Sequence, residues 1–477
     1  MTSRSSQSIA LGAAAAAGVV LAGCGKLAQS QLPEKVETND LAEEHRFLTR
    51  AAFGPRPGDL QRLRETGKAE WIDAQLAARE EEPLWLKAKL HRLDVLRMDG
   101  MELQDLPQDF VITQMQRAAI LRAVYSPNQL RERMVDFWSN HFNIYAKKGL
   151  GPYLMAADND SVIRSHALGS FPEMLRASAR SPAMLTYLDN AGNKRGAPNE
   201  NYAREIMELH SLGVDGGYTQ RDVQEVARCF TGWTIEERFL RRKGGFRFDP
   251  ALHDDGAKKV LGIKIPAGGG ERDGERVLQI LAMHPSTARH LSRKLLAFFG
   301  LPTTESEIAR IQQIYLDEQG AISPLLRAIL GRPDFTDPQH RRLKRPFDLM
   351  VSALRVTGAE TDAHPALIAQ LAAMRQPLHL WPMPDGFPID QVSWEGALLP
   401  RWNFLLALCE GRILGTGIAW AGLAKATGLS GEELAKFLTS GSRSGHEANL
   451  PPAGREPNLS SDQSTALALA APEFQWT

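Results

Sequence analysis

Two glutamates and a histidine lie within six positions of one another in the stretch NYAREIMELHSLG, residues 201–213. If such groups converged, they could act as a general acid and a general base, or hold a cation. On a helix that turns 100° per residue, Glu205 and Glu208 share a stripe with Asn201, whereas His210 points almost directly away from it. The two glutamates and His210 therefore cannot bind one metal ion or act on one substrate from this helix alone.

The pair Glu205 and Glu208 has two interpretations. In the first, it belongs to a solvated helix face, where Arg204 neutralises Glu208 at four-residue spacing. In the second, the face lines a polar cleft, where one carboxylate raises the pKa of the other and the two serve as acid and base or hold a cation. The sequence leaves both interpretations open.

The segment before this helix, YLDNAGNKRGAPNEN, is dense in oxygen donors. They are Asp189, Asn190, Asn193, Asn199 and Glu200, and they lead directly into Asn201. Counted from Asp189 as an EF-hand calcium loop, the segment has Ala191 and Lys194 where a ligand and a glycine belong. It therefore fails as an EF-hand, although its oxygens remain candidates for contact with a substrate.

Two further histidines are candidates. His141, in MVDFWSNHFNIY, shares a helical face with apolar side chains, as His210 does, and such histidines are either core residues or proton carriers. His253 begins His253-Asp254-Asp255-Gly256, which is either a turn or a catalytic loop. Asn140, beside His141, lies on the polar face of the same predicted helix.

The segment WPMPDGFPIDQVSW places Trp381, Phe387 and Trp394 among prolines. These aromatic side chains form either a rigid wall over the core or a face for a sugar or peptide ligand. The chain has no GxSxG elbow, no P-loop, no CxxC pair and no GxGxxG between a strand and a helix. The commonest hydrolase, nucleotide-binding and redox chemistries are therefore disfavoured.

Helical spacing dominates the elements that must position these residues. Apolar residues recur three and four positions apart in most segments, so we expect a mainly α-helical, multi-helical globular protein. A small β-hairpin is predicted at about 245–265, formed by two β-prone runs that flank a loop. Ser126-Pro127 is predicted to start a helix, and Gly300 and Gly358 to follow the ends of two others.

The predicted organisation is one helical domain over residues 40–439, with the hairpin inserted in it. Residues 440–463 are rich in Ser, Gly, Pro and Asn and are expected to form a flexible loop. Residues 464–477 are expected to close the same domain with a short helix. A hydrophobic content of 43% is enough for a large core.

The N-terminus predicts export. Arg4, the apolar run Ile9–Val20 and the small residues before Cys24 describe a lipoprotein signal peptide, residues 1–23, that is cut before Cys24. Lipid on Cys24 would anchor the chain to a membrane, and residues 24–39 would form a tether. Gly25 after the cysteine favours the outer membrane, with the chain facing the periplasm or the cell surface.

The charge balance and the remaining cysteines agree with that location. The chain has 56 basic and 56 acidic residues, which argues against nucleic acid as a partner. Cys229 and Cys409 lie in apolar helical contexts and are expected to be buried free thiols. One disulfide between them stays possible in an oxidising compartment, but there is no disulfide framework.

Long segments in a fixed order resemble a known family. They include FLTRAAFGPRPGDL, VDFWSNHFNIY, SPAMLTYLDN, NENYAREIMELHSLGVDGGYTQRDVQEVARCFTGWT, HDDGAKKVLG and RPFDLMVSALR. Together they are similar to the bacterial family called domain of unknown function 1800, from about Leu41 to Phe474. The resemblance implies an exported protein that works beside another exported envelope protein, and it assigns no catalytic residue.

Two hypotheses follow. In the first, the chain is an envelope hydrolase or transferase acting on a cell-wall or extracellular polymer. Its candidate catalytic residues are Glu205, Glu208, His141 and His253, and its candidate substrate-binding residues are Asn140, Asp189, Asn190, Asn201 and Asp254. In the second, the chain is a non-enzymatic binding or assembly protein for another exported component. The sequence identifies no cofactor and does not decide whether a metal binds.

Overall fold

The structure, a computed structural model, describes residues 43–78, 80–236, 244–427, 431–440 and 461–477. Within these ranges most residues are helical, and strands form only two-stranded antiparallel sheets. The mainly α-helical fold class is therefore confirmed. The expected signal peptide, Cys24, the tether and most of the 440–463 loop lie outside the described residues.

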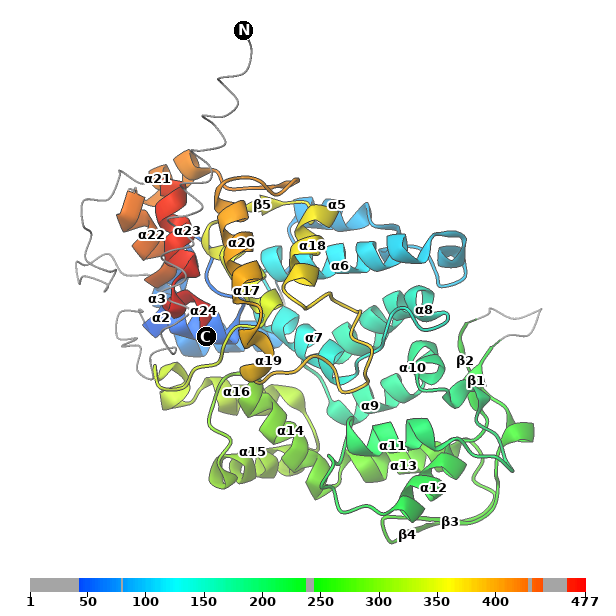
Figure 1. Cartoon of the computed structure of the whole chain (residues 1–477). Helices are drawn as coiled ribbons and strands as arrows, with labels where there is room; N and C mark the ends of the chain where they lie inside the picture. Colours follow the sequence, from blue (N-terminus) through cyan, green and yellow to red (C-terminus); the bar gives the residue numbers. More distant parts are fainter. Residues whose placement is uncertain (1–42, 79, 237–243, 428–430, 441–460) are drawn as a thin grey trace. The chain divides into compact units, whose positions relative to one another are not determined.

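The described chain is helical up to residue 229 (Figure 1). The α-helices of this part are α2 (Glu43–Ala51), α3 (Asp59–Thr66), α4 (Lys68–Ala77), α5 (Leu84–His91), α6 (Gln108–Tyr125), α7 (Gln129–His141), α8 (Gly151–Asp158), α9 (Phe171–Ala179), α10 (Pro182–Tyr187), α11 (Glu200–Glu208) and α12 (Gln220–Cys229). A π-helix, Asn159–Arg164, follows α8 directly.

Four short strands come next: β1 (Trp233–Ile235), β2 (Phe246–Phe248), β3 (Lys258–Val260) and β4 (Ile263–Ile265). The small hairpin expected at about 245–265 is present as β3 and β4, whereas β2, the first β-prone run of that region, does not join it. Strand β2 pairs with β1, and β3 pairs with β4. Leu261 and Gly262 both have positive φ, 48° and 81°, so this two-residue turn closes β3 onto β4 locally and leaves β2 to pair with β1.

The second half is again helical. Its α-helices are α13 (Arg272–Ala282), α14 (Pro285–Phe298), α15 (Glu305–Asp317), α16 (Ile322–Leu330), α17 (Pro346–Val356), α18 (Pro365–Ala373), α19 (Val392–Glu395), α20 (Leu398–Cys409), α21 (Trp420–Thr427), α22 (Gly431–Ser440), α23 (Ser461–Ala470) and α24 (Pro472–Gln475). Strands β5 (Glu360–Thr361) and β6 (Thr416–Gly417) pair antiparallel. Helices α14 and α15 lie side by side, and α23 packs against α20 and α22 (Figure 1).

Both predicted helix ends are confirmed, and the one predicted start is wrong. Gly300 and Gly358 follow α14 and α17 with φ of 73° and 60°, as a chain leaving a helix through a left-handed residue requires. The start predicted at Ser126-Pro127 is instead the end of α6, whose C-cap is Ser126. Helix α7 begins at Gln129, because the Ser126 hydroxyl and the following proline form the connection between the two helices.

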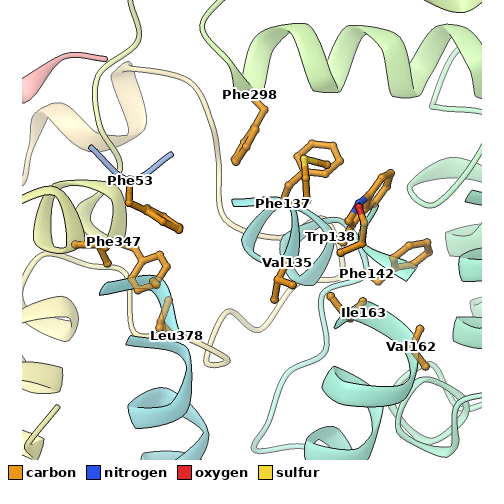
Figure 2. Close-up of a cluster of buried hydrophobic side chains, with 14 of the residues drawn as sticks. Phe53, Val135, Phe137, Trp138, Phe142, Val162, Ile163, Phe298, Phe347 and Leu378 are labelled. Atoms are coloured by element: carbon orange, nitrogen blue, oxygen red, sulfur yellow. The ribbon is translucent and has the colours of Figure 1, made fainter. Parts of the chain in front are cut away.

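Helix α7 lies at the centre of the packing and carries several of the candidate residues. It packs against α2, α4, α6 and the π-helix. Figure 2 shows Phe137 and Trp138 on one side of α7 and Val135 on another, and the rings of Phe137 and Phe298 are 5.1 Å apart between centroids. The described core is nearly continuous, and both Cys229 and Cys409 are buried in it as free thiols, as expected.

A buried ion cluster fixes α7 against α17. Asp348 accepts from Arg133 at 2.5 Å and from Arg342 at 2.9 Å, and Arg345 joins it to Asp136. The arginines hold the pKa of Asp348 well below its usual value, in spite of its burial. Removing either partner of such a buried pair leaves an uncompensated charge, so the cluster makes the register between the two helices hard to change.

Candidate functional site

Helix α11 carries Glu205 and Glu208 on a half-buried face. Asn199 caps its start by accepting the backbone N–H of Asn201 at 2.9 Å. The side chains on its buried face are Tyr202, Ala203, Ile206 and Met207. Glu205 and Glu208 lie on the other face and are half-buried, so neither is a freely solvated carboxylate.

The expected neutralisation of Glu208 by Arg204 is not observed. The Arg204 guanidinium contacts Glu200 at 3.2 Å and the side-chain oxygen of Gln220 at 3.0 Å. The hydroxyl of Tyr218 donates to Glu208 at 3.2 Å instead. A neutral donor leaves the negative charge of Glu208 in place beside Glu205.

That charge perturbs Glu205. Burial and, after it, the carboxylate of Glu208 raise the pKa of Glu205, and the carboxylate of Asp385 adds to the effect. The charges of Glu205 and Asp385 also reach Tyr187, whose pKa is raised mainly by its own burial. The carboxylates of Glu205, Glu208 and Asp385, which come from two distant parts of the sequence, are therefore close enough to influence one another.

Two asparagines of the α7 region hold the segment that carries Asp385. Asn143 donates its side-chain amide to the carbonyls of Trp381, at 3.0 Å, and Met383, at 2.7 Å. Asn140 donates to the Phe387 carbonyl at 2.9 Å and accepts the Phe387 N–H at 2.7 Å. Both asparagines therefore position backbone, and Asn140 is not a free substrate contact.

Within this segment the Asp385 carboxylate is itself oriented. The indole N–H of Trp381 donates to it at 2.9 Å. The hydroxyl of Tyr187, at the end of α10, donates to the Pro382 carbonyl at 2.8 Å. The Trp381 ring is half-buried, whereas Phe387 and Trp394 are buried together with Leu343, so of these three aromatic residues Trp381 presents a surface near Asp385.

Lys294 of α14 connects one of these carboxylates, Asp385, with His141. Its ammonium donates to Nδ1 of His141 at 2.9 Å, and Nε2 of His141 donates to the His210 carbonyl at 3.2 Å. This pattern requires a neutral imidazole, and burial together with the Lys294 charge holds the pKa of His141 well below its usual value. Burial lowers the pKa of Lys294 to about 8, although the Asp385 charge opposes the shift.

His210 and His290 complete the surroundings of Lys294. Burial is the main cause that lowers the pKa of His210 to about 3 and that of His290 to about 4, so both are neutral near pH 7. Their ring centroids lie 6.0 and 6.3 Å from that of His141. No group of three or more His, Cys, Asp or Glu side chains with metal-binding geometry occurs in the described ranges.

We name His141, Glu205, Lys294 and Asp385 the lysine–histidine site. Lys294 has no carboxylate within ion-pair distance among the described residues, and Asp385 acts on it only at longer range. Such a lysine gives up its proton far more easily than an ordinary one. The site thus combines a carboxylate of raised pKa with an ammonium of lowered pKa, which is the pairing that acid–base catalysis uses.

The polar loop before α11 is tied to its own neighbourhood. Asn190 is fully buried and donates to the carbonyls of Phe230 and Trp233. Asp189 accepts from Lys148 at 2.9 Å, and Asn201 donates to the Leu188 carbonyl at 3.2 Å. These three predicted substrate contacts therefore have partners within the protein, and their role in binding stays a prediction.

His253 lies in a separate group, the hairpin cluster, formed by His253, Lys258 and Asp273. One oxygen of Asp273 contacts Nε2 of His253 at 3.2 Å and the ammonium of Lys258 at 2.6 Å. Asp254 forms a two-point ion pair with Arg228, at 2.7 and 3.1 Å. In the described part of the chain, His253 and Asp254 share no hydrogen bond or ion pair with the lysine–histidine site.

Sequence reasoning missed Lys294 and Asp385. A signal for Lys294 was present, because it occupies the apolar stripe of α14 at four-residue spacing from His290 and Phe298. Asp385 carries no such signal: only the fold brings its segment beside α11. The same is true of the way Asn143 holds that segment.

The chain was compared with known proteins. Residues 46–476 match the profile of the family described as "Protein of unknown function (DUF1800)". No curated protein and no solved structure gave a match.

Proposed function

This chain belongs to the DUF1800 family of proteins of unknown function, and we propose that it is an exported, lipid-anchored hydrolase or transferase of the bacterial cell envelope. The observation that carries the enzymatic part is the hydrogen bond between Lys294, which has no ion-pair partner among the described residues, and the neutral His141, together with the Asp385 carboxylate, which acts on both Lys294 and Glu205. An arrangement that only stabilised the fold would place a carboxylate against the lysine.

The proposed location rests on the sequence alone. The apolar leader and the small residues before Cys24 support cleavage and lipid attachment there. Among the described helices, none is long and apolar enough to cross a bilayer. We expect labelled palmitate to be incorporated by the wild type and by Cys229→Ala, and not by Cys24→Ala. Equal labelling of Cys24→Ala contradicts the anchor.

The proposed mechanism assigns a proton donor and a proton acceptor. Near pH 7 the Glu205 carboxylate removes a proton from a water or a substrate hydroxyl, whose oxygen then attacks the scissile carbon. The Lys294 ammonium returns a proton to the leaving group, while His141 orients it through Nδ1. A transferase uses the hydroxyl of a second polymer chain in place of water.

A polymer of sugars or peptides suits the surroundings. The half-buried Trp381 ring next to Asp385 offers a flat apolar surface on which a sugar ring or a peptide side chain can stack. Asn140 and Asn143 hold this ring and the carboxylate in fixed positions relative to α7. We therefore place the scissile bond between Glu205 and Lys294, with the polymer running over Trp381.

The test uses the mature protein with isolated cell-wall and extracellular polymer from the source organism. Release of new reducing ends or free amino groups identifies the bond that is cleaved. We expect Glu205→Gln and Lys294→Met to lower the rate at least about 100-fold, since each removes a proton-transfer group. Glu200→Gln is the matched control, because Glu200 lies on the same helix but pairs with Arg204.

The pH profile separates catalysis from a structural role. A base of raised pKa and an acid of pKa about 8 predict a bell-shaped profile whose alkaline limb lies near pH 8. Lys294→Met should lose that limb along with most of the rate. If both variants keep the wild-type rate and profile on a polymer that the protein cleaves, the proposed site is wrong.

A second function, a binding or assembly protein for another exported envelope component, is favoured by one observation. Met383, Val392 and Leu399 are 56%, 76% and 56% exposed in the part of the chain that follows Trp381. Exposed apolar side chains are typical of interaction surfaces when they gather in one patch. Loss of a co-purifying envelope protein in Val392→Asp, with polymer cleavage absent in the wild type, supports this alternative.

A further inference from the structure

A cavity of about 100 Å³ lies on the side of α7 that carries Val135. Helices α6, α7 and α8, the π-helix and the segment around residues 376–387 enclose it. One ordered water needs roughly 10–15 Å³ on this scale, so the cavity has room for a molecule of several non-hydrogen atoms. It contains none of the four residues of the lysine–histidine site.

The walls of the cavity are mostly apolar. Figure 2 shows Val135 projecting from α7 between Phe347 and Leu378 on one side and Ile163 on the other. All four side chains line the cavity and are buried. Walls of this kind favour a ligand with an apolar body.

One carboxylate at the wall has no positive partner. Asp158, the last residue of α8, is only 9% exposed and accepts a hydrogen bond from the Ser181 hydroxyl through Oδ1. Its Oδ2 has no hydrogen-bond or ion-pair partner among the described residues. Burial raises the pKa of Asp158 to about 6, so near pH 7 an anion without a counter-ion faces the cavity.

The other carboxylates at this cavity are already compensated. Glu132 accepts two hydrogen bonds from Arg164, at 2.7 and 2.8 Å, and Asp136 pairs with Arg345. Arg122 also lines the cavity and is paired with Asp160 at 3.4 Å, so a cation that enters the cavity finds Asp158 as the carboxylate without a counter-ion. This contrast distinguishes Asp158 from a general acidic lining.

A buried amide adds a hydrogen-bond donor. Gln376 is 1% exposed, and its side-chain oxygen accepts the Phe347 N–H at 2.8 Å. Its Nε2 has no protein partner in the described ranges, and the residue lines the cavity. Because an ammonium with an apolar body carries no acceptor, this donor is left to water in the cavity and does not bond the ligand.

The π-helix provides a local reason for the cavity. It begins at Asn159, directly after Asp158, and its wider turn departs from the regular helix at this wall. Such segments are rare and occur often at functional sites. Ser139 and Asn159 at the wall are only half-buried, which marks the side from which solvent reaches the cavity.

We propose that this cavity binds a small organic cation, a primary ammonium with a short apolar body, whose nitrogen pairs with Asp158. The ammonium supplies the missing counter-ion, and the apolar body fills the space between Val135, Phe347 and Ile163. The inference does not depend on the proposed enzymatic function, because the two sites share no residue.

The probes are n-butylammonium and its neutral counterpart butan-1-ol, titrated against the protein by ligand-detected NMR. We expect saturable binding of n-butylammonium at least tenfold tighter than that of butan-1-ol. Asp158→Asn should remove the preference, because it removes the charge while an amide oxygen can still accept from Ser181. Asp109→Asn, on the exposed side of α6, should change nothing.

A second variant tests the cavity without touching the charge. Ala156→Val adds two methyl groups at the cavity wall and should block both probes, with circular dichroism confirming that the variant folds. Binding of n-butylammonium should also weaken below pH 6, where Asp158 takes up a proton. No saturable binding by the wild type, or equal binding by Asp158→Asn, overturns the proposal.

Discussion

The hairpin cluster and the lysine–histidine site contain the same kinds of side chain in opposite arrangements. In the hairpin cluster, one Asp273 oxygen sits between the Lys258 ammonium and the His253 ring, and all three side chains are buried. In the lysine–histidine site, the Lys294 ammonium donates to a neutral histidine instead. The nearest influence of a carboxylate on Lys294 is the longer-range effect of Asp385.

The difference separates stabilising charge from reactive charge. The charge of a buried lysine that contacts a carboxylate is compensated, and removing either residue leaves the other charge buried without a partner. The charge of a buried lysine that contacts a neutral imidazole is not compensated, so burial lowers the lysine pKa and the proton is lost more easily. The same composition therefore predicts a structural role at the hairpins and a chemical role beside α11.

The largest expected effect breaks the compensated pair. Asp273→Asn leaves Lys258 charged and buried with its ion pair removed, and His253 without its carboxylate. We expect a loss of about 3–5 kcal/mol in the free energy of unfolding, measured by urea denaturation. Asp255→Asn, at an exposed position two residues after His253, is the control and should cost far less.

Lys294→Met should raise the free energy of unfolding at pH 7, whereas Asp273→Asn lowers it. Because the folded state lowers the pKa of Lys294 from 10.5 to about 8, the unfolded state binds more protons between these values. The wild type therefore gains stability as pH rises from about 8 to 10.5, by up to about 3 kcal/mol. The variant should be the more stable one at pH 7, and the difference should shrink across that window. A variant that is less stable at pH 7 would contradict the uncompensated lysine.

How far the sequence predicts these two regions depends on the range of the interactions. Helical spacing and glycine stops follow from local sequence, so the helical class and the ends after α14 and α17 were predictable. The strand pairing was not, because the tight turn at Leu261-Gly262 competes with the longer loop for β3. Local spacing carries no information on whether a short strand pairs with the strand before it or the strand after it.

Only those features of the candidate site that follow from the geometry of a single helix were predictable from the sequence. The sequence separates Glu205 from His210 by helical geometry and marks His141 as an apolar-face histidine. The residues that give Glu205 and His141 their chemistry come from elsewhere: Asp385 acts on Glu205 and Lys294 bonds to His141. Contacts between segments so distant in sequence arise from tertiary packing, which periodicity cannot report.

A smaller loss of stability is expected when the hydrogen bonds that hold the Asp385 segment are removed. Asn143→Ala removes the donor to the Trp381 and Met383 carbonyls and should cost about 1–2 kcal/mol. Because the segment then shifts relative to α7, the pKa of Lys294 should move even though Lys294 is untouched. Its rate of acylation against pH measures that pKa, and an unchanged profile separates the segment from the site.

The smallest stability effect belongs to Glu205→Gln, and its sign sharpens the comparison. Since the pKa of Glu205 is raised in the folded state, the wild type loses stability as pH rises from 4.5 through the folded value. The amide removes the repulsion from Glu208 and Asp385, so at pH 7 we expect a gain of a few tenths of a kcal/mol, reduced by salt. Urea midpoints at pH 4 and pH 8 measure it. A loss above about 1 kcal/mol would instead make Glu205 a structural residue like Asp273, and the contrast between the two regions would fail.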